Sequence, residues 1–163
     1  MECLNWKNGF FSNTYTLFSG TTPIGELRNK SLSMTAYGEI NGKKILFRTK
    51  GILKQETEII DKETKELLGR ITYNTWMTKG IIELGDRKNN WKFDNLRNTR
   101  WRISDTDENL NSYVCTTTSG TIQQGIEDDI LTLAGLYIHN YNAQMSLVVI
   151  VAVFLPIWLT VLM

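Results

Sequence analysis

The sequence predicts a mainly β protein: a twelve-stranded antiparallel barrel around a central hydrophobic helix, followed by a C-terminal transmembrane helix. Three observations lead to this fold class. Short alternations of apolar and polar residues recur from Cys3 to Gln124, as expected for half-buried antiparallel strands. A segment that is apolar on almost every side follows from Ile130 to Ile138. An uncharged apolar stretch then runs from Met145 to Met163.

The strands are predicted from their alternation and from the turns between them. Ile45, Phe47 and Thr49 share one face of an alternating run, because successive side chains of a strand point to opposite sides. Asn41-Gly42 precedes this run and is a strong hairpin signal, since both turn residues favour positive φ angles. Twelve strands at this spacing are typical of a barrel or a sandwich. The predicted strands are residues 2–6, 13–19, 23–29, 33–40, 43–50, 56–62, 66–75, 78–85, 88–93, 99–105, 109–116 and 119–124.

The apolar segment after the strands predicts a buried helix. Glu127, Asp128 and Asp129 precede it, and acids favour a helix start, where free N–H groups and the positive end of the helix dipole lie. A barrel of twelve strands is too wide to be filled by its own side chains, since the diameter grows with strand number. We therefore expect a helix at about residues 128–142 on the barrel axis. Its predicted core residues are Ile130, Leu131, Leu133, Leu136 and Tyr137.

Residues 145–163 predict a membrane-spanning helix that serves as a tail anchor. At 1.5 Å per residue this stretch is roughly 28 Å long as a helix, close to the hydrocarbon thickness of about 30 Å. No Lys, Arg, Asp or Glu follows Asp129. A polar interruption from His139 to Gln144 favours a position at the membrane surface between the two helices. The predicted anchor residues include Leu147, Ile150, Phe154 and Trp158.

The predicted organisation is one barrel domain, residues 1–144, and one anchor, residues 145–163. The first residues of the chain have neither a basic start nor an apolar run, so no signal peptide is predicted. Cys3 and Cys115 lack the spacing of a disulfide framework. We therefore expect a single-pass membrane protein with its N-terminal domain in the cytoplasm.

The sequence predicts no enzyme, and no cofactor, metal or nucleic acid as a ligand. His139 is the only histidine, and no pair of Cys or His residues has the spacing of a zinc site. Residues 105–109 begin like a calcium loop, but Leu110 and Thr116 replace the Gly and Glu that such a loop requires. This segment is therefore interpreted as a hairpin turn. The formal charge of +1 gives no general attraction to nucleic acid.

Two groups of basic residues are candidates for binding a lipid headgroup. Each Lys or Arg that faces anionic lipid contributes about 1 kcal/mol to membrane binding. Acidic residues are interspersed among them, so a solvated barrel exterior explains the same charges and both interpretations stay open. The first group is Lys43, Lys44, Arg48 and Lys50, and the second is Lys92, Arg97, Arg100 and Arg102.

Several segments together resemble a known family. They are Lys50-Gly51, residues 58–61, residues 68–71, Trp91-Lys92-Phe93, residues 101–105 and residues 129–136. In order and spacing, over about residues 10–142, they resemble the tubby C-terminal-domain-like superfamily, which includes the phospholipid scramblases and the LURP-one-related proteins. The resemblance implies a twelve-stranded barrel that encloses a hydrophobic C-terminal helix. In the tubby branch a basic patch binds phosphoinositide headgroups, so it also implies a lipid ligand.

These observations favour a non-enzymatic, membrane-tethered barrel that binds a lipid headgroup, a small ligand or a partner protein at the membrane surface. The expected partner is membrane lipid, with an anionic phospholipid headgroup as the candidate ligand. One alternative is scramblase-like translocation of phospholipid, although a single helix without a polar face offers lipids no path through the bilayer. The other alternative is a purely structural anchor protein.

Overall fold

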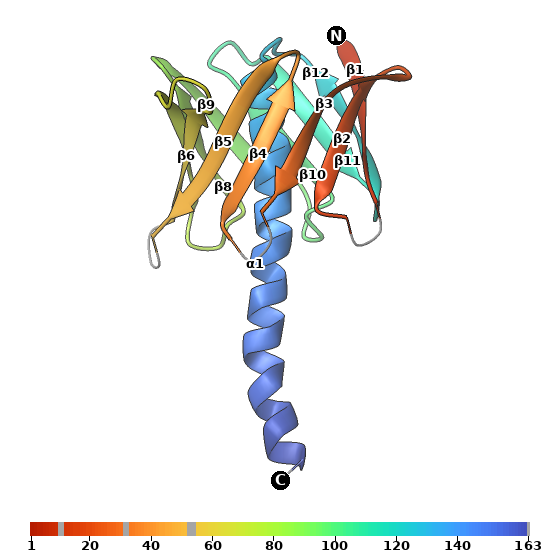
Figure 1. Cartoon of the computed structure of the whole chain (residues 1–163), viewed down its shortest axis with the longest axis vertical. Coiled ribbons are helices and arrows are strands. Elements are labelled where there is room, and N and C mark those ends of the chain that lie inside the picture. Colours follow the sequence, from red (N-terminus) through yellow and green to blue (C-terminus); the bar gives the residue numbers. More distant parts are fainter. Residues whose placement is uncertain (10–11, 31–32, 52–54, 163) are drawn as a thin grey trace.

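Twelve antiparallel strands form a closed barrel in a computed structural model of the protein, which describes residues 1–9, 12–30, 33–51 and 55–162 (Figure 1). Each strand pairs with its neighbours in the sequence, and β1 closes the barrel against β12. The predicted twelve-stranded antiparallel barrel is therefore confirmed. The elements are β1 (Glu2–Asn8), β2 (Thr14–Ser19), β3 (Thr22–Asn29), β4 (Thr35–Ile40), β5 (Lys43–Lys50), β6 (Glu56–Asp61), β7 (Leu67–Thr72), β8 (Lys79–Leu84), β9 (Arg87–Phe93), β10 (Arg100–Ser104), β11 (Leu110–Cys115), β12 (Ser119–Gln124) and the helix α1 (Asp129–Leu162).

The strands follow the alternation of the sequence. In β5, Ile45 and Phe47 are buried, whereas Arg48 between Phe47 and Thr49 is exposed. The turn before β5 has positive φ angles at Asn41 (48°) and Gly42 (81°), as its sequence predicts. Apolar side chains therefore collect on one side of the sheet, where they face α1.

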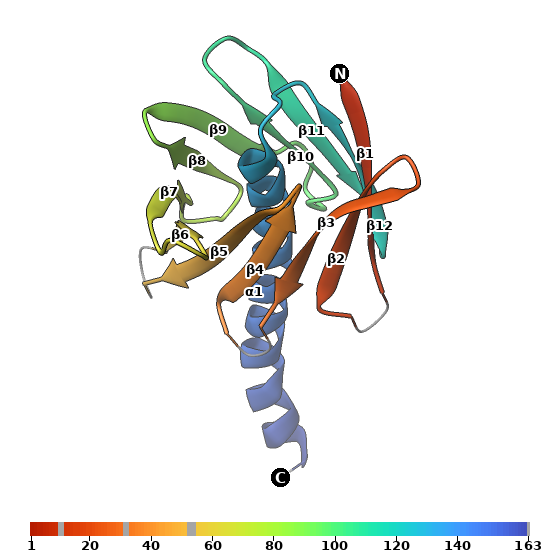
Figure 2. The same cartoon turned by 45° about the horizontal axis from the view of Figure 1, so that its top comes forward.

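Helix α1 packs against the buried side of the barrel wall formed by β3, β4 and β5, to which its backbone lies close. Gly38 of β4 permits this approach, because a Cβ atom there would lie 2.9 Å from Cδ1 of Leu133. Every residue from Leu131 to Ile138 is buried. Figure 2 shows strands on both sides of this part of the helix. The helix is not on the barrel axis as expected, because it rests on one wall.

Aromatic side chains cover the side of α1 that faces away from β4. The indole N–H of Trp101 donates to the carbonyl oxygen of Gly135 at 2.9 Å, and the hydroxyl of Tyr113 donates to the carbonyl oxygen of Leu131 at 3.3 Å. Gly135 has no room for a side chain, since its Cβ would lie 2.3 Å from Cζ of Tyr113. These large rings fill the width that a twelve-stranded barrel leaves beside an off-axis helix.

The predicted separation into a core helix and an anchor helix is wrong, because α1 is continuous from Asp129 to Leu162. The polar residues that suggested a break have partners in the barrel. Asn140 and Asn29 exchange two amide hydrogen bonds, both 2.6 Å long. His139 stacks on Trp101 with ring centroids 4.6 Å apart, rather than lying at a membrane surface. Buried polar groups that are fully hydrogen-bonded do not interrupt a helix.

The C-terminal half of α1 leaves the barrel and projects from it (Figure 1). Every residue from Leu147 to Leu162 is exposed, although nearly all are apolar. This part is long and apolar enough to cross a bilayer. It fits a tail anchor, in agreement with the prediction. The start of the helix also agrees, since the Asp128 carboxylate accepts hydrogen bonds from the N–H groups of Ile130 and Leu131.

Candidate functional site

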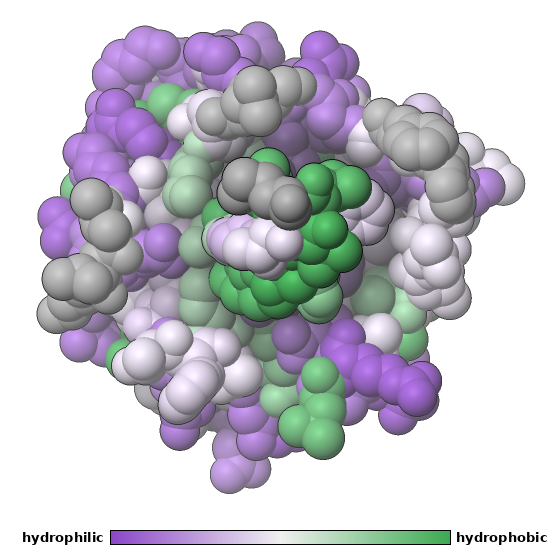
Figure 3. Space-filling view, turned by 90° about the horizontal axis from the view of Figure 1, so that it is seen from below, coloured by the Kyte–Doolittle hydropathy of each residue, from purple (hydrophilic) through white to green (hydrophobic). Residues whose placement is uncertain are grey.

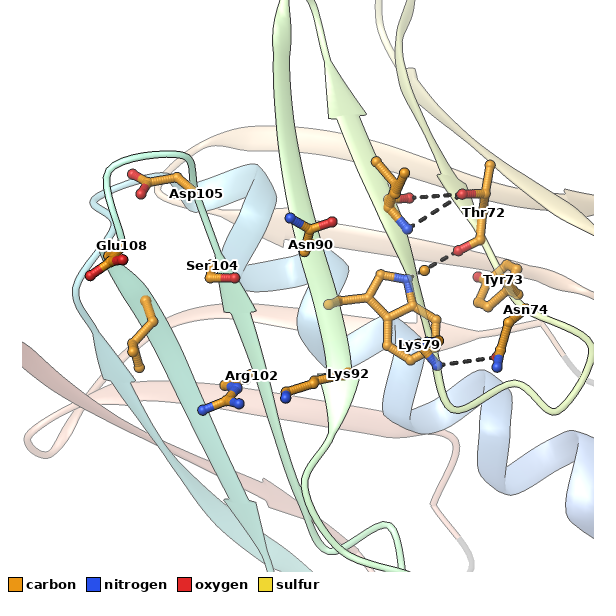
Figure 4. Close-up of a pocket in the computed structure, with 14 residues that line it drawn as sticks. Thr72, Tyr73, Asn74, Lys79, Asn90, Lys92, Arg102, Ser104, Asp105 and Glu108 are labelled. Carbon is orange, nitrogen blue, oxygen red and sulfur yellow. Dashed lines mark hydrogen bonds between the residues drawn. The ribbon is translucent and has the colours of Figure 1, made fainter.

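An open groove of about 870 Å³ lies on the outer face of the barrel over β7, β8, β9 and β10. Figure 4 shows the side chains that line it. Its size is in the range of sites that hold small ligands, which is about 300–1,000 Å³. The groove is the feature of the described surface that best combines volume with charged side chains, so it is the candidate site.

The floor of the groove forms where the β7–β8 ladder stops. Ile71 is the last residue of β7 that pairs with β8. Beyond it, the side-chain hydroxyl of Thr72 takes the place of a backbone hydrogen-bond acceptor. This hydroxyl accepts from the N–H of Ile81 at 3.3 Å. The indole N–H of Trp91 donates to the carbonyl oxygen of Thr72 at 3.1 Å. Gly80 allows this contact, because its Cβ would lie only 2.6 Å from the indole nitrogen.

Three basic residues form a row across the groove, and we name them the cation row: Lys79, Lys92 and Arg102. Lys79 of β8 lies directly opposite Lys92 of β9, which in turn lies opposite Arg102 of β10. Arg102 forms an ion pair with Asp94, with 3.3 Å between Nε and Oδ1. Within the described residues, no ion pair involves Lys79 or Lys92. The row therefore carries uncompensated positive charge.

Two acids lie at the other end of the groove from Lys92 and Arg102 (Figure 4). Asp105 organises the turn between β10 and β11: it accepts from the side-chain amide of Asn109 at 3.0 Å and from the backbone N–H groups of Asp107 and Asn109. The bond from the Asn109 side chain lowers the pKa of the Asp105 carboxyl. The segment is a hairpin turn, as predicted. The groove is thus positive at one end and negative at the other.

Residues of the first predicted basic group are paired with acids. Lys43 binds Asp129 at the start of α1, with 2.8 Å between Nζ and Oδ2. Arg48 and Lys50 both bind Glu58, at 2.7 and 2.9 Å. Lys50 and Arg48 together lower the pKa of the Glu58 carboxyl through these hydrogen bonds. The fourth member, Lys44, binds Glu63 at 3.1 Å. These ion pairs neutralise most of the positive charge of the group, so little of it is available to bind an anionic ligand.

The structure brings only two of the four members of the second predicted basic group together. Lys92 and Arg102 belong to the cation row, whereas Arg97 lies exposed in the turn after β9 and Arg100 is exposed at the start of β10. Sequence reasoning missed Lys79. Its signal was weak: the residue is the second of a predicted strand, and only the strand register places it beside Lys92.

The structure also places the predicted core and anchor residues. Four of the five core residues are fully buried and Ile130 is half-buried. The four anchor residues are exposed, by 62% at Leu147, 52% at Ile150, 54% at Phe154 and 69% at Trp158. In the described residues, no three His, Cys, Asp or Glu side chains converge as in a metal site.

In comparisons with known proteins, no family model matches the chain, and neither a curated protein nor a solved structure is significantly similar to it.

Proposed function

We propose that this protein is a membrane-anchored, non-enzymatic β-barrel that binds the anionic headgroup of a phospholipid in the groove over β8–β10. The cation row carries this proposal. Lys79, Lys92 and Arg102 lie directly opposite one another on adjacent strands. Like charges in directly opposed positions destabilise a sheet. An anion bound between them would remove this repulsion and form charge-assisted hydrogen bonds.

The position of the row near the exit of α1 supports a lipid ligand. Lys79 directly follows the turn after β7, and Lys92 shortly precedes the turn after β9. Both turns contact Asn142 of α1: its amide donates to Met77 at 3.2 Å and accepts from Asn98 at 3.0 Å. Asn142 lies just before the exposed part of the helix. If that part spans a bilayer, the cation row faces the nearby membrane surface, within the range of its negative potential.

The resemblance to the tubby-like superfamily supports the same ligand class. A closed barrel of twelve antiparallel strands followed by a long C-terminal helix agrees with the strand architecture that the resemblance implies, although the helix packs against one wall and is not central. We therefore propose membership of that superfamily, and a site of the phosphoinositide-binding kind, for this chain. The scramblase-like alternative is less favoured. The exposed half of α1 has one described hydroxyl beyond Ser146, at Thr160, and it donates to the carbonyl oxygen of Ile157.

Removing the two unpaired lysines is expected to weaken headgroup binding. In the variant Lys79→Ala/Lys92→Ala, the loss of two cations at about 1 kcal/mol each corresponds to a roughly 30-fold higher Kd. The measurement is calorimetric titration of inositol trisphosphate into the full chain in zwitterionic nanodiscs. The matched control, Lys44→Ala/Lys88→Ala, removes the same net charge from lysines that bind Glu63 and Glu83.

The control variant should keep the parent Kd. Equal weakening in both variants would show that only general charge matters, and the groove would not be the site. If the parent chain bound no inositol trisphosphate at all, the proposal of a phosphoinositide-binding site in the groove would be wrong.

We further propose that the barrel lies on the cytoplasmic side. Both cysteines are free thiols, which suits a reducing compartment. A membrane-impermeant maleimide is therefore expected to label the exposed Cys3 only after cells are permeabilised. The control is a cysteine variant of a known extracellular protein in the same cells, which should react without permeabilisation. Labelling of Cys3 in intact cells would reverse the orientation.

A further inference from the structure

Two large apolar side chains are exposed at the barrel end from which α1 leaves. Trp76, in the turn between β7 and β8, is 82% exposed, and Leu96, in the turn between β9 and β10, is 104% exposed. Both turns are held against Asn142 of α1 by hydrogen bonds. Seen from this end, pale and green residues lie beside the helix, and many of the strongly hydrophilic ones lie further out (Figure 3).

The two turns are built in the same way and hold these side chains in fixed positions. In the first, the Asn74 side-chain oxygen accepts from the N–H groups of Thr78 and Lys79, at 2.8 and 3.2 Å. In the second, Asn95 accepts from Thr99 and Arg100, at 3.0 and 3.1 Å. In each turn the residue before the Thr has a positive φ angle, 55° at Met77 and 54° at Asn98. The exposure of Trp76 and Leu96 therefore comes from ordered turns.

Two turns at the opposite end use a carboxylate for the same purpose. Asp61 accepts from the N–H groups of Glu63 and Thr64 at 2.8 and 2.9 Å, and Asp105 accepts from those of Asp107 and Asn109 at 2.9 and 3.0 Å. The turn at 74–78 contains no charged residue and the turn at 94–99 contains two, whereas the turn at 62–66 contains four. Neutral amides and an exposed Trp suit the membrane interface, and carboxylates suit water.

The exposed apolar part of α1 begins without a spacer below these turns. Leu147, the first residue of the continuous exposed apolar run, lies five residues after Asn142, about 7–8 Å along the helix. Trp76 and Met77 line a crevice of about 890 Å³ together with Val149 and Ile150. Trp76 is therefore at the level of helix residues that need a hydrocarbon environment.

From these observations we infer that the barrel sits directly on the bilayer, with the turns at 74–78 and 94–99 immersed in its headgroup layer. Trp76 and Leu96 insert at the interface, where aromatic side chains are favoured. The occupant of this surface is the bilayer that holds α1, because the turns are continuous with the exposed span. This inference rests on the proposed membrane anchorage but not on headgroup binding in the groove.

Site-specific fluorescence in the full chain tests the inference. The protein carries Cys3→Ser and Cys115→Ser, and one further variant, Leu96→Cys, Asp86→Cys or Leu155→Cys, is labelled with the fluorophore NBD. The labelled chains are reconstituted in phosphatidylcholine vesicles with a minor share of phosphatidylserine. We expect iodide to quench the label at position 96 severalfold less than the label at position 86, which lies in a turn at the opposite end of the barrel. Lipids that carry a doxyl group near the headgroup should quench the fluorescence of the label at position 96. Lipids that carry the doxyl group deep in the acyl chain should quench the label at position 155.

The three positions separate the possible failures. Equal iodide quenching at 96 and 86, with position 155 buried in lipid, would overturn the seated barrel and leave the anchor intact. Iodide access at 155 would overturn the anchor and the inference together.

An added charge gives a second readout: Asn95→Asp keeps the backbone hydrogen bonds of the turn and should reduce doxyl quenching at 96 severalfold. Asp105→Asn at the far end should leave it unchanged. No effect of Asn95→Asp would also contradict immersion.

Discussion

Leu136→Asp is expected to abolish the folded barrel. Leu136 is fully buried in the part of α1 that packs against the strands. A carboxylate there would be buried without a cation, at a cost of several kcal/mol. Typical domains are stable by only about 5–15 kcal/mol, and the cavity left by the leucine adds to the loss. The full chain in detergent micelles should lose its near-UV circular dichroism and its cooperative thermal transition.

Two controls make this result specific. Ala143→Asp puts the same charge two turns further along α1, at an exposed position, and should keep the transition. Leu136→Met keeps the volume and should cost less than about 1.5 kcal/mol. A melting temperature of Leu136→Asp within a few degrees of the parent would show that the strands fold without α1, against the packing described above.

Ending the chain at Gln144 is expected to move the protein from membranes to the soluble fraction. Residues 145–163 contain twelve Leu, Ile, Val or Phe, worth about −4 to −7 kcal/mol on the insertion scale. The shortened chain keeps the buried part of α1, so the barrel should remain folded. The measurement is the distribution between pellet and supernatant after a carbonate wash, with the full chain as the control that stays in the pellet.

A wash with carbonate or high salt matters for this test because the shortened barrel keeps the proposed membrane contacts, which are the cation row and the exposed Trp76 and Leu96. Such contacts would be peripheral, and peripheral contacts do not resist these washes. A truncated chain that remained in the washed pellet would contradict the assignment of the anchor to residues 145–163.

Local pattern was enough to predict the strands. All twelve were found, with the largest difference in β7, which ends at Thr72 and not at residue 75. Alternation continues to Thr75, but the ladder with β8 stops after Ile71. The end of a strand depends on its partner, which periodicity in one segment does not report. The twelve-strand count and the terminal helix could therefore be predicted, and some strand ends could not.

The position and continuity of the helix needed tertiary information. The polar residues after Ile138 suggested a break because their partners are far away in the sequence. Asn29 precedes Asn140 by 111 residues, and nothing near either residue identifies the pair. The off-axis position likewise depends on the small Gly38 on one side and large aromatic rings on the other. Separately, each of these is an ordinary strand residue.

The candidate site shows the same limit. Counting charges identified Lys92 and Arg102 but also selected Lys43, Arg48 and Lys50, which the fold pairs with acids. Lys79 was missed because its neighbours in the row come from other strands. Cross-strand register, rather than local charge density, decides which cations remain unpaired on a barrel.

Because α1 is unbroken, the barrel and the exposed part of the helix are connected without a flexible linker. Membrane helices tilt to match their apolar length to the thickness of the bilayer, on average by about 20°. Since α1 is continuous from Asp129 to Leu162 and its buried part is held among the strands, a tilt of the helix at the point where it leaves the barrel would turn the barrel with it. If the exposed part of α1 spans a bilayer as proposed, a thinner bilayer would lower one flank of the barrel towards the lipid and raise the other. Bilayer thickness would then set how near the cation row lies to the membrane surface, without any conformational change within the barrel.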